Sequence, residues 1–184
     1  MKRVTVFCAS SFGTDPEFEK QAFLLGKTLA DNGIGLVYGG ANVGLMGAVA
    51  NGALQGNGEV IGVLPHFLQQ KELAHNGLTE LILVETMHER KTKMNDLSDG
   101  VIALPGGFGT LEELFEILTW GQLGLHKKPV AILNSNGFYN ELIAFIDTMV
   151  NKGVLKAVNR DMLIVSDTIP PGFLMQKLFE CTFL

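Results

Sequence analysis

Short apolar runs of strand length alternate along this chain with segments of helical periodicity, and this alternation restricts the fold more than any other feature. Strand, helix and strand in that order favour right-handed crossover connections and a parallel sheet. Apolar runs without polar interruption fit a sheet that is covered on both faces. We therefore predict an α/β fold: a Rossmann-like, doubly wound, mostly parallel sheet with helices on both faces. Strands are expected at 4–8, 34–38, 60–64, 80–84, 101–104, 130–133 and 163–165, and helices at 16 to about 32, 45–55, 87–97, 139–151 and 172–179, with another opening at Leu111.

The composition predicts one packed domain and excludes several kinds of partner. The chain has 184 residues, of which 47% are hydrophobic, so it can bury one core, and no linker divides it. We expect a single nucleotide-binding α/β domain over 1–184. Acidic residues outnumber basic ones by 19 to 14, so no basic surface for nucleic acid is expected. No apolar stretch reaches the roughly 18 residues of a membrane span, so no membrane partner is expected.

The cysteines and histidines form no metal-binding pattern. Cys8 and Cys181 lie near opposite ends of the chain, and the four histidines show no ligand spacing. We expect no metal site, no disulfide framework and a reducing, cytoplasmic location.

Two glycine-rich turns follow expected strands and account for part of the 22 glycines. The first, GGANVGLMG at 39–47, matches neither the GxGxxG fingerprint nor a Walker loop. The second, PGGFGT at 105–110, opens a helix at Leu111. Ligands of open α/β sheets bind outside the carboxyl ends of strands, and helix N-terminal amides attract anions. The second turn therefore fits a phosphate site, or alternatively a tight turn in which Thr110 is the N-cap and Glu113 completes a capping box.

Two cations fall on the inward face of the helix expected at 87–97. Apolar residues recur at 87, 94 and 97, and Arg90 and Lys91 share that stripe, whereas Lys93 lies off it and is expected in solvent. A buried guanidinium needs a partner, which is either a substrate phosphate or an acidic residue. The alternative is that both side chains extend to solvent.

The helix that opens at Leu111 carries two acidic residues at its start. Glu112 and Glu113 either stabilise the helix dipole or place one carboxylate in the same pocket as Arg90. Trp120 is expected in a core or an interface rather than as a stacking platform. Apolar residues cover more than one face of this helix, which favours burial by another surface, either within the subunit or in an oligomer.

Several segments together resemble the LOG (Lonely Guy) family, whose members are also labelled lysine decarboxylase-like. The resemblance extends from about Val4 to Leu155. The matching segments are MHERK, PGGFGTLEE, TWGQLGLHKKP, FCASSFG, YGGANVGLMGAVANGAL and VIGVLP.

The resemblance implies a nucleoside 5′-monophosphate phosphoribohydrolase. Such an enzyme cleaves the N-glycosidic bond of cytokinin riboside 5′-monophosphates, AMP or both to a free base and ribose 5-phosphate. It also implies a homodimer with each site near the dimer interface, and catalysis by Arg90 and Glu113. The implied substrate-binding residues are Glu72, Arg90, Lys91, Gly106, Gly107, Phe108, Gly109, Thr110, Leu111, Glu112, Glu113 and Thr119.

The residue types fit this reaction. Ribosyl cleavage passes through an oxocarbenium-like transition state, which a carboxylate such as Glu113 stabilises. Arg90 is expected to hold substrate oxygens or to assist the leaving base. A non-catalytic nucleotide-binding or carrier module on the same fold is the alternative, although a pure binder does not require both residues. No cofactor is expected, because no lysine has a convincing setting for pyridoxal phosphate.

Overall fold

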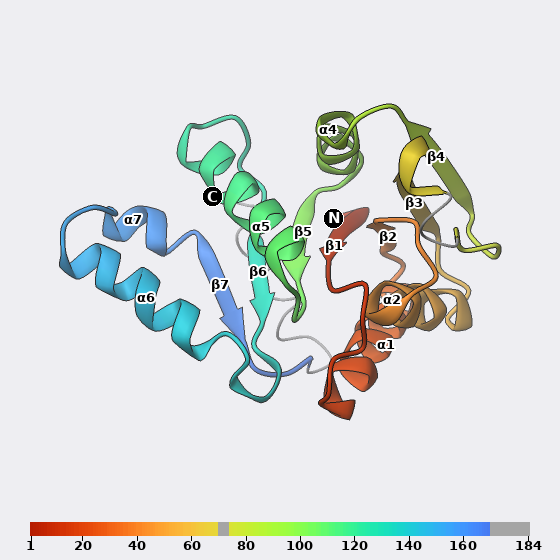
Figure 1. The fold of residues 1–184 in the computed structure, drawn as a ribbon, viewed down its shortest axis with the longest axis horizontal. Helices are drawn as coiled ribbons and strands as arrows, with labels where there is room; N and C mark the ends of the chain where they lie inside the picture. The colour runs from red at the N-terminus through yellow and green to blue at the C-terminus, as the bar shows by residue number, and fades with distance from the viewer. Residues whose placement is uncertain (70–73, 170–184) are drawn as a thin grey trace.

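The computed structural model describes residues 1–69 and 74–169, and within them all strands belong to one parallel sheet (Figure 1). The strands follow the spatial order β4-β3-β2-β1-β5-β6-β7. They are β1 (Arg3–Phe7), β2 (Gly35–Tyr38), β3 (Val60–Pro65), β4 (Glu80–Val84), β5 (Gly100–Ala103), β6 (Val130–Leu133) and β7 (Leu163–Ser166). The helices are α1 (Pro16–Asp31), α2 (Gly44–Gln55), α3 (His66–Gln69), α4 (Met87–Leu97), α5 (Phe108–Gln122), α6 (Asn140–Asn151), α7 (Ala157–Arg160) and the 3-10 turn η1 (Ser135–Gly137).

The direction of chain winding reverses between β1 and β5. From β1 the chain adds β2, β3 and β4 outward on one side, and it then returns to place β5 on the other side of β1. In the registers, Thr5 pairs with Val37 of β2 and with Val101 of β5. The carboxyl ends of β1 and β5 therefore form the switch point, where sheets of this kind hold their ligands.

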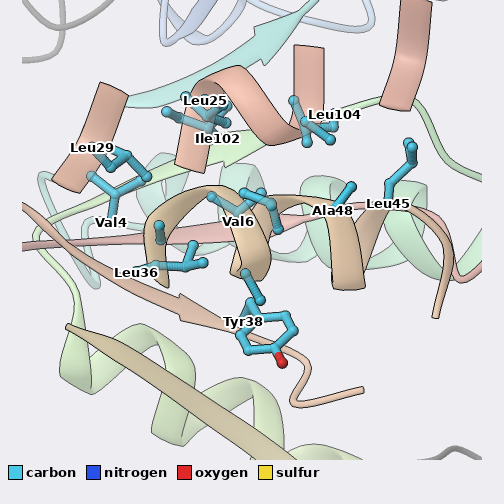
Figure 2. Packing of buried hydrophobic residues seen from close by; sticks show 14 of the residues in the cluster. Val4, Val6, Leu25, Leu29, Leu36, Tyr38, Leu45, Ala48, Ile102 and Leu104 are labelled. Carbon is cyan, nitrogen blue, oxygen red and sulfur yellow. The ribbon is translucent and has the colours of Figure 1, made fainter. Parts of the chain in front are cut away.

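The helices form two layers, each with its own apolar cluster. On one face, Leu25 and Leu29 of α1 and Leu45 of α2 pack on Val4 and Leu36 of the sheet (Figure 2). On the other face, apolar residues of α4, α5 and α6 pack on the remaining strand side chains: Met94, Leu114, Ile117 and Ile146 with Val37, Val101 and Ile132. Both faces of the sheet are covered, which confirms the predicted doubly wound α/β class.

The contact between α1 and α2 depends on small residues. A Cβ added at Gly26 of α1 would collide with the carbonyl of Val49, and one added at Gly52 of α2 would collide with the carbonyl of Phe23. These glycines therefore let the two helix backbones approach each other closely.

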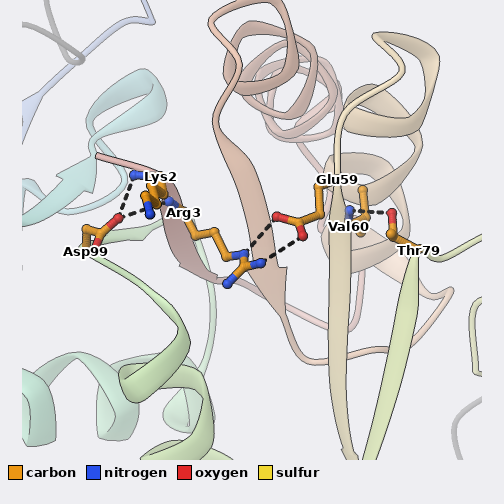
Figure 3. Close-up of polar contacts among 6 residues, drawn as sticks. All are labelled: Lys2, Arg3, Glu59, Val60, Thr79 and Asp99. Atoms are coloured by element: carbon orange, nitrogen blue, oxygen red, sulfur yellow. Dashed lines mark hydrogen bonds and ion pairs between the residues drawn. The ribbon is translucent and has the colours of Figure 1, made fainter.

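Polar contacts tie the strands together at the amino edge of the sheet. Arg3 forms a two-pronged pair with Glu59, with N···O distances of 2.7 and 2.8 Å (Figure 3). Asp99 accepts hydrogen bonds from the amides of Lys2 and Arg3, and Thr79 accepts one from the amide of Val60. This edge is braced by the protein's own side chains and lies opposite the switch point.

Most element boundaries follow local sequence signals. Asp15 caps α1 by accepting from the amide of Glu17, Pro16 is its first residue, and Gly33 follows its end with φ of +69°. These are the predicted start and stop signals. The short α7 and η1 were not predicted, and the helix expected at 172–179 lies outside the described residues.

The start of α5 differs from the prediction. The helix begins at Phe108 with Gly107 at the N-cap and no side-chain cap, whereas we expected it to open at Leu111. Thr110 is therefore a helical residue, 4% exposed, and its side chain packs against Gly106. The capping box between Thr110 and Glu113 is wrong, because tertiary packing takes the threonine side chain away from the helix end.

None of the helices among the described residues is both long and apolar enough to cross a membrane.

Candidate active site

A cavity of about 380 Å³ opens at the carboxyl ends of β1 and β5. It brings together the segment after β1, the helix α4 and the second glycine turn with the start of α5. Its lining residues are Cys8, Ala9, Ser10, Ser11, Met87, Arg90, Gly107, Phe108, Gly109, Thr110, Glu112 and Glu113. The cavity therefore contains both residues expected to act in catalysis, although they lie 23 positions apart in the chain.

The second glycine turn presents the N-terminus of α5 to this cavity. In the part of the chain that the structure describes, no side chain caps that end of the helix, and no acidic residue lies in its first turn. A Cβ at Gly107 or Gly109 would meet nothing within 4 Å, so both positions border open space, whereas a Cβ at Gly106 would collide with Thr110. Uncapped amides and the helix dipole make this turn a suitable anion site.

Arg90 is buried, with 8% of its surface exposed. Its Nε donates to the carbonyl of Val63 at 3.1 Å and its Nη2 to the carbonyl of Gly39 at 3.4 Å. A Cβ at position 39 would collide with the guanidinium, which explains the glycine there. Among the described residues no carboxylate forms an ion pair with Arg90. The side chain is thus held by carbonyls of β3 and of the residue after β2, and the alternative that it extends to solvent is wrong.

Glu113 is half-buried in the same cavity and forms no ion pair with any residue of the described ranges. Burial raises the pKa of Glu113 to about 7, although the charge of Arg90 opposes this rise. Because α5 starts at Phe108, Glu113 lies beyond its first turn, and the helix dipole does not explain either acidic residue. A carboxyl group that titrates near neutral pH in a cavity is typical of a functional site.

Lys91 is bound by two carboxylates. Its Nζ lies 2.6 Å from Oε1 of Glu112 and 3.0 Å from Oε1 of Glu116. Like Arg90 it is 8% exposed, so it does not extend to solvent, whereas Lys93 is exposed as expected.

Other expected site residues lie elsewhere. Thr119 is exposed, donates to the carbonyl of Phe115 at 2.7 Å and lines a separate apolar groove. Leu111 is half-buried and is not among the residues that line the cavity. Trp120 packs on the apolar cluster under α5, as predicted for a core residue. Glu72 lies outside the described residues.

The segment that follows β1 was not predicted to line the site. Cys8, Ser10 and Ser11 line the cavity, as does Met87 of α4. The rule that ligands bind at carboxyl ends of strands would have found this segment, because it directly follows the first strand. Burial raises the pKa of the Cys8 thiol, so the thiol is protonated at neutral pH.

The described residues hold no group of three His, Cys, Asp or Glu side chains able to bind a metal ion.

An all-parallel sheet with a cavity at its switch point places this chain among Rossmann-type α/β proteins. Comparison with known proteins narrows the class. A family model described as possible lysine decarboxylase matches residues 46–171. The chain belongs to this family, and its relatives identify it as a member of the LOG proteins, as the resemblance indicated.

Two relatives illustrate the similarity. The cytokinin riboside 5′-monophosphate phosphoribohydrolase LOG7 of Arabidopsis thaliana is 45% identical over 163 residues, covering 89% of this chain and 75% of that protein. The enzyme with the same descriptive name from Rhodococcoides fascians is 47% identical over 169 residues, covering 91% and 85%. Among solved structures, the molybdenum cofactor carrier protein of Chlamydomonas reinhardtii has a TM-score of 0.73 at 20% identity, covering 100% of this chain and 99% of that chain. That likeness shows the fold alone.

Proposed function

We propose that this protein is a nucleoside 5′-monophosphate phosphoribohydrolase. It hydrolyses the N-glycosidic bond of cytokinin riboside 5′-monophosphates, AMP or both, and releases a free base and ribose 5-phosphate. The observation that carries the proposal is that Arg90 and Glu113 share one cavity beside the start of α5, and that neither forms an ion pair with a described residue. The names of the relatives at 45–47% identity support the same reaction.

In the proposed reaction the 5′-phosphate binds at the backbone amides of 106–110, with the dipole of α5 behind them. Glu113, as a carboxylate, stabilises positive charge at the anomeric carbon as the bond to the base breaks. The base leaves with the bonding electrons and takes up a proton, and water adds to the anomeric carbon. Arg90 holds substrate oxygens or assists the leaving base. Phe108 and Glu112, which line the cavity, are proposed as further substrate contacts, as the resemblance implies.

Lysine decarboxylation, which the description of the family model names, does not fit Lys91. Pyridoxal phosphate is held as a Schiff base, which forms from a neutral lysine amine. Burial alone would lower the pKa of Lys91, but the hydrogen bonds to Glu112 and Glu116 outweigh it and raise the pKa above its ordinary value. The ammonium group next to the cavity is therefore stabilised in its charged form.

An assay of products separates the proposed enzyme from a carrier module on the same fold. Purified protein is mixed with AMP and with N6-substituted analogues, and free base and ribose 5-phosphate are measured. The expected result is stoichiometric release of both products with repeated turnover. Binding of the nucleotide with no free base over many hours would favour the carrier.

We also propose that the protein is a homodimer. An apolar groove of about 180 Å³ lies between α5, α6 and α7, with Phe115, Leu118, Met149 and Leu155 in its lining. Beyond the end of α5, Leu123 and Leu125 are 66% and 68% exposed. Thr119, which the resemblance places at the substrate, lines this groove rather than the cavity, and a dimer with shared sites accounts for its position.

We propose further that the chain forms a single domain, because its described strands share one sheet, and that it is cytoplasmic. The free thiol of Cys8 is compatible with a reducing location.

A further inference from the structure

Five charged side chains meet where α4 packs beside α5. Helix α4 contributes Arg90 and Lys91, and α5 contributes Glu112, Glu113 and Glu116. The salt bridges within this set all belong to Lys91, which contacts Glu112 at 2.6 Å and Glu116 at 3.0 Å. Lys91 therefore binds two of the three carboxylates, whereas Glu113 and Arg90 form no ion pair within 1–69 and 74–169.

The burial of Lys91 makes the loss of its carboxylate partners costly for stability. The Lys91 side chain is 8% exposed, that of Glu116 is 24% exposed and that of Glu112 is 55% exposed. Exposed ion pairs contribute little, but a buried ammonium group that loses its partners is strongly destabilising. Lys91 thus has a structural reason to remain with these carboxylates rather than to turn toward a ligand.

We infer that Lys91 is a positioning residue, which ties α4 to α5 and offsets part of the negative charge of Glu112 and Glu116 so that Arg90 and Glu113 stay free for the substrate. This inference deepens the proposed function and rests on it. It also departs from the resemblance, which implies that Lys91 itself binds the substrate.

The inference has an electrostatic consequence for Glu113. The charged or titratable groups around this carboxyl are Arg90 and Lys91 from α4, Glu112 and Glu116 from its own helix, and Cys8 at the end of β1. Burial is the main reason that its pKa is about 7, Arg90 and Lys91 lower it, and the two glutamates raise it. Without Lys91, the full negative charge of Glu112 and Glu116 would act on Glu113 and raise its pKa further.

The test compares Lys91→Met with Glu116→Gln, because the two substitutions shift the ionisation of Glu113 in opposite directions. The pH dependence of kcat/KM reports the free enzyme, and the wild type is expected to lose activity below an apparent pKa of about 7. Lys91→Met should raise this apparent pKa by roughly one unit, which lowers kcat/KM about tenfold at pH 6, and Glu116→Gln should lower it. The KM for AMP at pH 9 should change less than about threefold in either variant.

Two further variants are matched controls. Lys93→Met removes the same charge from an exposed position on the same helix and should leave the profile unchanged. The double variant Lys91→Met with Glu116→Gln should return the apparent pKa most of the way to the wild-type value. A large rise in KM for Lys91→Met that the second substitution does not reverse would overturn the inference and make Lys91 a direct ligand. An unchanged profile in both single variants would overturn it as well.

A measurement without substrate separates this inference from the proposed function. Titration of the Glu113 carboxyl carbon by NMR in the ligand-free protein should show the same opposite shifts. If the wild type released no ribose 5-phosphate, the proposed function would be wrong. The titrations would still show whether Lys91 affects the ionisation of Glu113 as inferred. If Lys91→Met does not fold, the Glu116→Gln variant alone tests the inference. An unchanged pKa of Glu113 in that variant would overturn it.

Discussion

Arg90 is buried without a carboxylate partner among the described residues, and this makes its charge available to a ligand. Its hydrogen bonds go to the carbonyls of Gly39 and Val63, which satisfy donors but leave the net charge in place. Glu113 lines the same cavity, and it too forms no ion pair with the residues that the structure describes. An unpaired cation and an unpaired carboxyl group in one low-dielectric site are costly for stability, and their juxtaposition fits a site that a substrate completes.

Glu113→Gln should separate function from stability at this position. In the proposed reaction the carboxylate stabilises the transition state, and an amide cannot do so, therefore kcat should fall by about 10² to 10⁴-fold. Steady-state release of ribose 5-phosphate measures this loss. Hydrolysis at the wild-type rate by the variant would remove Glu113 from the catalytic assignment.

The same variant has a pH-dependent effect on stability, whose sign follows from the raised pKa. Below about pH 4 the carboxyl is protonated in both the folded and the unfolded chain, so its ionisation costs nothing. Above pH 7 the folded protein must hold a buried charge that the unfolded chain exposes to water, so Glu113 lowers the free energy of unfolding. Glu113→Gln should therefore unfold like the wild type at pH 4 and be more stable by about 1–3 kcal/mol at pH 8, as urea denaturation would measure.

At the scale of elements, the glycines divide into those that pack helices and those that border the cavity. Gly26 and Gly52 bring the backbones of α1 and α2 into contact. Gly107 and Gly109 border open space at the start of α5, where a side chain would have room but would obstruct the proposed phosphate. Glycine thus allows close helix packing at one pair of positions and leaves the cavity open at the other.

Gly26→Ala and Gly109→Ala should change the free energy of unfolding in opposite directions, and only Gly109→Ala should change the KM. The first places a Cβ against the carbonyl of Val49, so α1 and α2 must move apart, and the free energy of unfolding should fall by about 1–3 kcal/mol with an unchanged KM. The second replaces a helical glycine where nothing collides, so it should stabilise the protein by about 0.5–1 kcal/mol. It should nevertheless raise the KM for AMP about tenfold or more.

Urea denaturation and steady-state kinetics on the same preparations check both glycine variants. A Gly109→Ala protein with wild-type KM would show that the start of α5 does not approach the substrate closely.

At the scale of the whole molecule, two surfaces differ in how completely the fold covers them. The sheet is covered on both faces, and its amino edge is braced by the pair of Arg3 and Glu59. The groove beside α5, in contrast, leaves Phe115 36% exposed among other apolar side chains. Apolar surface of this kind is typical of protein interfaces.

Phe115→Arg should weaken the proposed homodimer. A charged side chain in an apolar interface loses its hydration without a partner, so the variant should dissociate at concentrations where the wild type does not. Sedimentation equilibrium should give about twice the chain mass of 19.9 kDa for the wild type and a lower mass for the variant. Leu24→Arg on α1, at an apolar position that is 43% exposed, is the control and should remain dimeric. A wild type that is monomeric at micromolar concentration would contradict the proposal.

Local periodicity and local caps were enough to predict the strands, most helix boundaries and the position of Arg90 and Lys91 on the apolar stripe of α4, but the burial of these two side chains is seen only in the structure. The Asp15-Pro16 start of α1 and Gly33 after its end are examples. Only the tertiary structure decided where α5 begins, because Thr110 is buried against Gly106 instead of capping the helix. Only the structure also decided which carboxylates Lys91 binds, since Glu112 and Glu116 lie 21 and 25 residues further along the chain. Periodicity shows which face of a helix is buried, but the partner on that face depends on how the chain winds around the sheet.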